Sequence, residues 1–432
     1  MKKSKFIKSS IILIIGGMLT KALGMLVKII LSRCVTTHVL GLYSLIIPTF
    51  LLLITISGLG LTTSLNVLIS SKKYNNKNLI ITSLIISLSI DFLIIIFLCF
   101  THRWIATLLF KSELLSYPIL SMGFILPFIS ISNIFRSYYF SKERLIPHVV
   151  SNILEDLVKV ILILLFINKI SNNIPLTLTF IIGINIFSEL SSILIFLYKA
   201  PKFTIYIEDL KPNIKNIKAL LSISIPTTIS RLIGSITYFL EPIILTGILL
   251  HIGYSNDYIV NEYGIINAYV LPILLLPSFF TNAISQALIP SISLYYTKRD
   301  FKNLKKRINQ ATIISLILGI IFTIFIICFG SILLKILYKT NSGIKYIRLL
   351  APIFLFHYIE HPLLASIQAM NKAKINMKIS LVNMFIRTIL LALLCFLKIG
   401  IYPLLIALSL NILFSCFYSA HIVNKIIRLE NK

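Results

Sequence analysis

The pattern of apolar and polar residues divides the chain into twelve long apolar segments separated by short polar ones. The first six cover residues 10–32, 40–70, 79–100, 115–139, 148–168 and 175–198, and the second six cover 219–249, 264–292, 309–330, 347–368, 377–397 and 401–424. A helix needs about 20 apolar residues to cross a bilayer. Segments of this length exceed the strands of membrane barrels, and backbone groups in hydrocarbon must bond internally. We therefore expect an all-α polytopic membrane protein with about twelve transmembrane helices.

The amino-acid composition supports this prediction and excludes several other classes of protein. Of 432 residues, 57% are apolar and 13% are charged, about half the roughly 25% charged residues of soluble domains. This balance excludes a soluble enzyme, a disordered chain and a secreted disulfide scaffold. The formal net charge of +27 is typical of nucleic-acid binders. However, no polar basic domain is left once the apolar segments are removed, so we expect no nucleic-acid partner.

The distribution of basic residues predicts the orientation in the membrane. If the N-terminus is cytoplasmic, 26 of the 41 Lys and Arg residues fall in cytoplasmic segments and 9 in outer loops. Cytoplasmic loops carry an excess of Lys and Arg. We therefore expect a multi-pass protein of the plasma membrane with both termini in the cytoplasm.

The two groups of six segments look like a parallel internal repeat. In the first segment, Lys21 and Lys28 share one helix face with Gly17 and Gly24, and in the seventh segment Arg231 and Gly234 are spaced like Lys21 and Gly24. We expect two six-helix bundles with these bounds: residues 1–198, a cytoplasmic linker over 199–218, a second bundle over 219–424 and a cytoplasmic tail over 425–432.

Charged residues inside the predicted spans are the main candidates for function. Each costs roughly 2.5–3.5 kcal/mol on insertion scales, so it should face the bundle interior and find a partner. Six are basic and six are acidic, which permits internal neutralisation. They are Lys21, Lys28, Arg136, Lys159, Arg231 and Arg387, and Asp91, Glu155, Asp156, Glu189, Glu241 and Glu360.

The stripe of Lys21 and Lys28 is the clearest of these signals. Neither lysine has an acidic residue three or four positions away, and Gly24 leaves space beside them. Lysine and arginine in a wet cavity suit a phosphate or pyrophosphate group. We therefore predict that Lys21, Lys28 and Arg231, with Gly24 and Gly234, bind substrate. Lys28 could instead extend toward the membrane surface.

Other charges in the spans allow a structural role. Glu155 and Lys159 are four residues apart in the favourable order on a helix, so self-neutralisation is the preferred interpretation. Arg136 is either an anchor at the cytoplasmic surface or a substrate-binding gate for an anionic headgroup. A third set is predicted to form ion pairs or to couple transport to an ion, namely Glu189, Glu241, Glu360 and Arg387.

The segment His357-Tyr358-Ile359-Glu360-His361 formally matches a metalloprotease pattern. No third metal ligand is recognisable, and Pro362 follows in an apolar segment. A polar lining or a proton-sensitive element is the better interpretation. We expect no enzymatic activity, no metal and no cofactor, and we leave open a coupling ion, Na⁺ or H⁺.

Several short motifs resemble one known family. The sequence contains Thr20-Lys21-Ala22-Leu23-Gly24, then Lys28, Arg33 and Gly41-Leu42-Tyr43, later Arg136-Ser137-Tyr138-Tyr139-Phe140, and then Ser224-Ile225-Pro226 and Arg231-Leu232. Their order resembles the stage V sporulation protein B family. That family belongs to the polysaccharide flippases of the multidrug/oligosaccharidyl-lipid/polysaccharide exporter superfamily.

This resemblance implies a V-shaped pair of six-helix bundles with alternating access around a cationic cavity. It also implies a bacterial source and an undecaprenyl-pyrophosphate-linked sugar as substrate, a precursor of peptidoglycan or polysaccharide. The implied partners are membrane lipids and cell-wall synthesis enzymes. Two features depart from the family: Lys28 stands where Arg is commoner, and many relatives have fourteen helices.

Our leading hypothesis is a flippase for a lipid-linked sugar in cell-envelope or spore synthesis. The alternative is a multidrug exporter of the same fold coupled to Na⁺ or H⁺, for which Glu189 and Glu241 are the candidate acids. A scaffold protein that transports nothing does not explain twelve ionisable groups within the spans.

Overall fold

The computed structural model describes residues 2–71, 74–199 and 214–430, and nearly all of them are helical. The described part contains no β-strand. The predicted all-α class is therefore confirmed.

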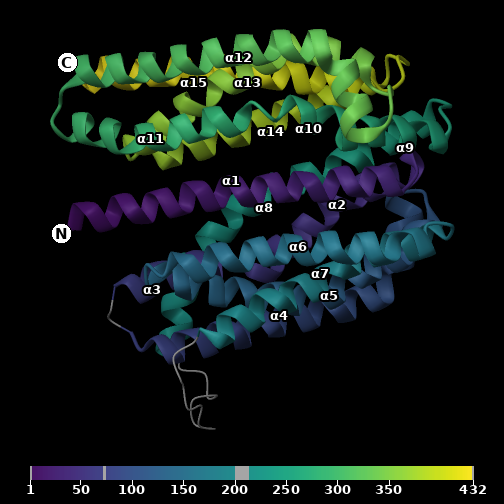
Figure 1. Ribbon diagram of the computed structural model, residues 1–432, viewed down its shortest axis with the longest axis horizontal. Helices are drawn as coiled ribbons and strands as arrows, with labels where there is room; N and C mark the ends of the chain where they lie inside the picture. Colours follow the sequence, from purple (N-terminus) through teal and green to yellow (C-terminus); the bar gives the residue numbers. More distant parts are fainter. Residues whose placement is uncertain (1, 72–73, 200–213, 431–432) are drawn as a thin grey trace. The chain divides into compact units, whose positions relative to one another are not determined.

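The first half of the chain forms long helices at the predicted positions (Figure 1). A short π-helical turn (Ile105–Leu109) continues α4, and a 3-10 turn (Glu113–Leu115) precedes α5. The helices are α1 (Lys2–Cys34), α2 (Thr37–Gly58), α3 (Leu61–Ser70), α4 (Asn76–Trp104), α5 (Ser116–Ser141), α6 (Leu145–Ile170) and α7 (Ile174–Tyr198).

The second half follows the same plan. A π-helical turn (Ile265–Val270) links α9 to α10. The helices are α8 (Ile214–His251), α9 (Asn256–Gly264), α10 (Leu271–Leu274), α11 (Ser278–Thr297), α12 (Phe301–Tyr338), α13 (Ile344–Ala369), α14 (Ala373–Cys395) and α15 (Tyr402–Glu430).

Among the described residues, nine helices are long and apolar enough to cross a membrane, or ten if the bent run from α9 to α11 is one span. Helices α1 and α6 are also long enough, but α6 carries three charged residues near its middle, Glu155, Asp156 and Lys159. Counting both with the ten would give the twelve spans that the sequence predicts. The chain is thus a multi-pass membrane protein, and the number twelve stays a prediction.

The contacts within the chain form two compact units, Met1–Phe239 and Leu240–Lys432. In the first unit, α5 packs against α2, α3, α4 and α7, and α6 packs against α1 and α7. In the second, α13 packs against α11, α12 and α15, and α14 packs against α15. The change from one unit to the other falls inside α8. Most of the predicted linker (199–218) lies outside the described residues, so the predicted bundle boundaries stay predictions.

The helix starts support the predicted repeat. Helices α5, α6 and α7 begin at Ser116, Leu145 and Ile174, and α13, α14 and α15 begin at Ile344, Ala373 and Tyr402. Each start in the second set follows its counterpart in the first by the same interval. The last three helices of each half are therefore laid out in the same order and spacing.

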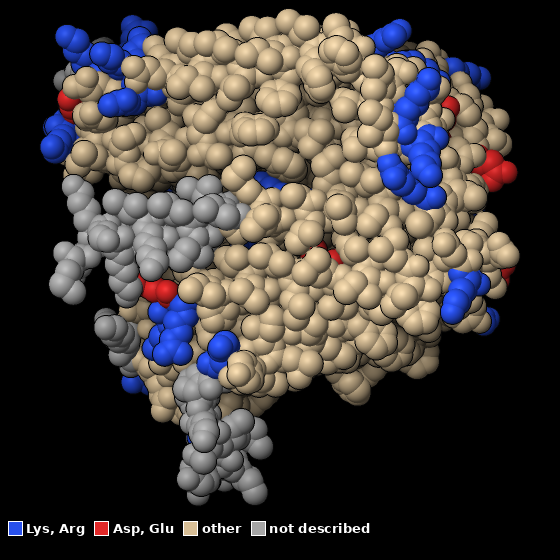
Figure 2. Space-filling model, viewed as in Figure 1, with Lys and Arg blue, Asp and Glu red and all other residues tan. Residues whose placement is uncertain are grey.

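The outer surfaces of the helices are strongly apolar. On α12, a row of exposed Ile and Phe side chains runs from Ile313 to Ile336, and α4 exposes Phe92, Phe97 and Phe100. Figure 2 shows Lys and Arg side chains mostly near the helix ends, with other residues between them. Soluble proteins rarely expose apolar areas of this extent, so these faces are suited to contact with lipid.

The second predicted span is interrupted in its middle. Helix α2 ends at Gly58, and both Leu59 (φ 38°) and Gly60 (φ 60°) adopt left-handed backbone conformations before α3 begins. A Cβ atom added at Gly60 would lie 2.8 Å from the carbonyl oxygen of Ser224 and 2.9 Å from the hydroxyl of Thr228. Helix α8 therefore packs against the break at a distance that only glycine permits.

We expect Gly60→Ala to destabilise the protein, because the left-handed conformation costs a side chain about 1–2 kcal/mol and the new methyl group would meet backbone. The midpoint of thermal unfolding in detergent should fall. Gly58→Ala is the matched control, since a Cβ atom there has nothing within 4 Å and Gly58 is helical. Equal midpoints for the two variants would contradict this account of the break.

Candidate functional site

The first unit contains a group of four charges from three helices, set back from the surface. Arg136 comes from α5, Glu155 and Lys159 come from α6, and Glu189 comes from α7. Arg136 Nη2 lies 2.9 Å from Glu155 Oε2 and 3.5 Å from Glu189 Oε2, and Lys159 Nζ lies 2.7 Å from Glu155 Oε1. Two positive and two negative groups thus balance. We call these four residues the four-charge cluster.

Serine hydroxyls complete the surroundings of Arg136. Its Nη2 donates to Ser132 Oγ at 3.1 Å and to Ser192 Oγ at 3.3 Å. The side chains of Arg136 and Glu189 are 20% and 9% exposed, so each depends on the other for neutralisation. Removing one partner of a buried ion pair costs about 3–5 kcal/mol, because it leaves an uncompensated charge. The four-charge cluster therefore ties α5, α6 and α7 together.

The second unit neutralises its charges differently. Arg387 on α14 forms an ion pair with Glu241 on α8, whose side chain is 7% exposed. One turn earlier on α14, Asn383 Nδ2 donates to Ser415 Oγ at 2.6 Å, and the Ser415 hydroxyl donates to Glu360.

The repeat relates these residues to the four-charge cluster. Asn383 and Arg387 lie as far from the start of α14 as Glu155 and Lys159 lie from the start of α6. The repeat thus keeps a cation at one position, while its acidic partner comes from another helix.

The residues predicted to bind substrate lie on exposed faces of the first unit. Lys21, Lys28, Arg231 and Gly234 are exposed, and Arg231 Nη2 donates to Thr63 Oγ1 of α3 at 3.2 Å. A Cβ atom built at Gly24 or Gly234 would have nothing within 4 Å. These two glycines therefore leave open space beside the cations.

The remaining predictions separate into two groups. The pairing of Glu155 with Lys159 is confirmed. Arg136, predicted as an anchor or a gate, contacts two acids that no local pattern indicates, because they lie on other helices. The pairing of Glu241 with Arg387 is likewise beyond any local pattern. The substrate-binding and coupling roles assigned to these residues stay predictions.

His357 and His361 lie on one face of α13. His357 Nδ1 lies 3.6 Å from Glu360 Oε2, and the two imidazole ring centres are 4.8 Å apart. Within the described residues, no group of three His, Cys, Asp or Glu side chains is placed to hold a metal ion. The structure therefore places the two histidines beside Glu360 on α13, and their role as a polar lining or a proton-sensitive element stays a prediction.

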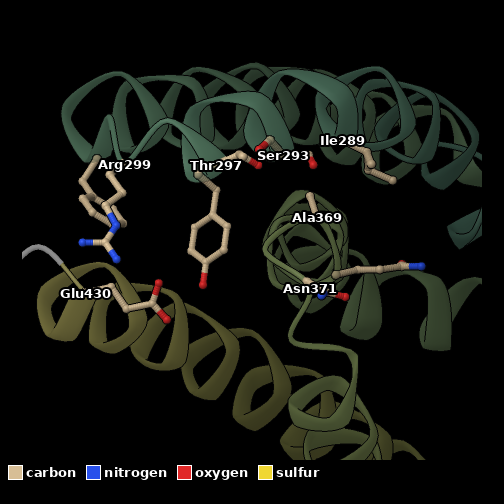
Figure 3. Close-up of a pocket in the computed structure, with 10 residues that line it drawn as sticks. Ile289, Ser293, Thr297, Arg299, Ala369, Asn371 and Glu430 are labelled. Carbon is tan, nitrogen blue, oxygen red and sulfur yellow. Dashed lines mark hydrogen bonds between the residues drawn. The ribbon is translucent and has the colours of Figure 1, made fainter.

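A pocket of about 860 Å³ opens at one end of the second unit (Figure 3). The Arg299 and Glu430 side chains lie on the same side of it in Figure 3. Glu430 Oε1 also lies 2.9 Å from Lys372 Nζ, and the hydrogen bond to Glu430 raises the pKa of Lys372. No local pattern in the sequence indicates this pocket, because its residues come from α11, from the turn before α12 and the first residue of α12, from the end of α13 and the turn after it, and from the end of α15. Since Glu430 and Lys372 neutralise each other, we assign it no substrate.

Comparison with known proteins identifies the family. Residues 6–296 match the family described as "Polysaccharide biosynthesis protein". The chain belongs to this family. Residues 266–397 also match the family model described as "MatE".

Two proteins of Bacillus subtilis (strain 168) are similar over most of the chain. Stage V sporulation protein B is 30% identical over 402 residues, which are 90% of this chain and 77% of that protein. Sporulation protein YkvU is 26% identical over 395 residues, 86% of this chain and 84% of that protein. The resemblance inferred from the short motifs is therefore confirmed.

The fold is that of a solved transporter. An inward-facing multidrug resistance MATE family transporter of the MOP superfamily superimposes with a TM-score of 0.75 at 16% identity, covering 95% of each chain. The chain therefore has the fold of this transporter over nearly its whole length.

We expect Arg136→Met to lower the stability of the purified protein by about 3 kcal/mol, since Glu155 and Glu189 would lose a shared cation. The midpoint of thermal unfolding in detergent measures this loss. Arg144→Met, at an exposed position between α5 and α6, is the control and should stay within about 0.5 kcal/mol.

Adding Glu189→Gln to Arg136→Met restores the balance of charge and should recover part of the lost stability. The result that would contradict this account is additivity: Glu189→Gln would then lower the stability of Arg136→Met by as much as it lowers that of the unmodified protein. The two residues would in that case not stabilise each other.

Proposed function

We propose that this protein moves an undecaprenyl-pyrophosphate-linked sugar from the cytoplasmic to the outer leaflet by alternating access. The observation that carries the proposal is the exposure of three cations in the spans, while three others are partly buried. Arg136, Lys159 and Arg387 are partly buried against acids. The other set, which consists of Lys21, Lys28 and Arg231, is exposed beside glycines.

The exposed set suits the chemistry of a pyrophosphate. Lysine supplies a compact charge, and the guanidinium of Arg231 can bind a phosphate through two parallel hydrogen bonds. Arg231 already donates to a neutral hydroxyl, Thr63 Oγ1, and an anion offers it a stronger acceptor. The match of residues 6–296 to the family described as "Polysaccharide biosynthesis protein" supports a substrate that contains sugar. In this proposal the partners are membrane lipids and enzymes of cell-wall synthesis.

The setting that we propose is the plasma membrane of a bacterium, with both termini in the cytoplasm. The 26 basic residues in the predicted cytoplasmic segments and the Bacillus relatives support it. Excess positive charge on that side also favours contact with anionic lipid.

A Na⁺- or H⁺-coupled multidrug exporter is the second candidate, favoured by the MatE match over residues 266–397. An exporter of organic cations needs acids that the substrate can reach. Glu189 and Glu241 are instead paired with Arg136 and Arg387, which favours the flippase. Transport of an organic cation by the purified protein, driven by a pH or Na⁺ gradient, would reverse this order.

We expect Lys21→Ala and Arg231→Ala each to reduce flipping by about tenfold or more, because a charge-assisted hydrogen bond contributes about 1.5–3 kcal/mol. The assay reconstitutes the full chain in vesicles with undecaprenyl-pyrophosphate-linked sugars and measures access of the headgroup to an impermeant reagent.

Lys169→Ala is the matched control. Lys169 is an exposed lysine at the end of α6, and its loss should leave flipping unchanged. All variants should keep the thermal midpoint of the unmodified protein. Near-normal flipping by both Lys21→Ala and Arg231→Ala would refute the proposed pyrophosphate site.

A further inference from the structure

A fully buried acidic side chain in the spans takes no part in the ion pairs described above. Asp91 lies in the middle of α4, with 0% of its surface exposed. Within the described residues, neither carboxylate oxygen makes a hydrogen bond of standard geometry. A buried carboxyl group without a counter-charge is stable only when a proton or another cation neutralises it.

The groups around Asp91 are oxygens from three helices. The hydroxyls of Ser57 and Ser130 lie beside the carboxylate, and they hydrogen-bond to each other at 2.9 Å. Ser87, one turn before Asp91, donates from Oγ to the backbone carbonyl of Ser57 at 3.2 Å. All three serines are at most 2% exposed. We call Ser57, Ser87, Asp91 and Ser130 the Asp91 site.

In the part of the chain that the structure describes, no basic side chain is close enough to neutralise the site. On α4 itself, Lys77 and Arg103 are each more than three turns from Asp91, on the order of 20 Å along the helix. Helix α2 carries His38 and Tyr43 near its other end, and α3 carries no titratable residue. On α5 the only charged residue is Arg136, which is bound to two acids of the four-charge cluster.

The break between α2 and α3 adds negative potential at the same place. Ser57 lies in the last turn of α2, just before the left-handed residues Leu59 and Gly60. The last carbonyls of a helix lack partners within it and carry partial negative charge. Interrupted transmembrane helices use such ends to hold Na⁺ or protons. The Asp91 carboxylate of α4 and the C-terminal end of α2 therefore both favour a cation at the same place.

We propose that the Asp91 site binds one small monovalent cation, either Na⁺ or a proton. A single carboxylate carries one negative charge, which matches a monovalent ion. Hydroxyl, carbonyl and carboxylate oxygens are ligands for hard cations. Full burial excludes an organic cation. This site is separate from the exposed stripe of Lys21 and Lys28, and it does not depend on the proposed substrate.

The repeat shows that the site belongs to the first unit alone. The second half also has a broken span, between α10 and α11, with a bend of 51°. However, when positions are counted from the start of each helix, Leu316 of α12 stands where Asp91 stands in α4. One half thus has a helix break with a buried acid, and the other has a helix break without one.

The test measures thermal unfolding of the purified full chain, first against Na⁺ at fixed pH with K⁺ holding the ionic strength, then against pH without Na⁺. Bound ligand raises the midpoint by mass action. For a Na⁺ site, the midpoint should rise with Na⁺. For a proton site, it should fall as pH rises, because deprotonation leaves a bare buried carboxylate.

Asp91→Asn should abolish the response to Na⁺ or, for a proton site, make the fall of the midpoint with pH smaller, and Ser130→Ala should weaken the apparent affinity by about tenfold. Glu113→Gln, which changes an exposed acid of the 3-10 turn before α5, is the control and should respond like the unmodified protein. If Asp91→Asn does not fold, binding of radioactive Na⁺ and proton uptake by Ser130→Ala and the unmodified protein decide the question.

The proposal is overturned if the unmodified protein responds to neither ion, or if Asp91→Asn responds as the unmodified protein does. Flipping assays distinguish this result from failure of the proposed function. If the unmodified protein flips the lipid but responds to neither cation, the Asp91 site alone is refuted. If it responds to a cation but Lys21→Ala and Arg231→Ala flip normally, the substrate site alone is refuted.

Discussion

The pairing of Arg136 with Glu155 and Glu189 is the interaction on which the first unit depends. A charge in hydrocarbon is tolerated only when another charge faces it inside the protein. Because the three residues come from α5, α6 and α7, neutralisation requires these helices to pack in one arrangement and register. Ser132 and Ser192 occupy further hydrogen-bonding capacity of the same guanidinium. The charges therefore specify how α5, α6 and α7 pack, more closely than apolar contacts alone would.

The second unit satisfies the same constraint with other residues. Helices α13, α14 and α15 repeat the positions of α5, α6 and α7, but Arg387 finds its acid on α8. The helix plan is thus shared between the halves, while the charges are specific to each half. The two units therefore differ in their charges although they share a helix plan. The first unit has the exposed cations Lys21, Lys28 and Arg231, and in the second Glu241 forms an ion pair with Arg387.

The positions of the helices could be predicted well, because hydropathy averaged over about 20 residues reflects the thickness of the bilayer. The pair of Glu155 and Lys159 could also be predicted, since both partners lie on one helix and its period sets their distance. The partners of Arg136 and Arg387 could not, because they depend on which helices meet. The break after Gly58 could not be predicted from hydropathy, because the average over a window hides the effect of Gly58 and Gly60. Two glycines this close together are themselves a sign of a helix break.

Helix α8 belongs to both units, because the boundary between them falls within it. Its residues up to Phe239 group with the first half, where Ser224 and Thr228 close over Gly60. Glu241, two residues beyond Phe239, is held by Arg387 of the second half. Severing the chain at the predicted linker would therefore strip the first half of a helix that covers its broken span. Co-expressed halves would have to reassemble before the first half reached its native packing.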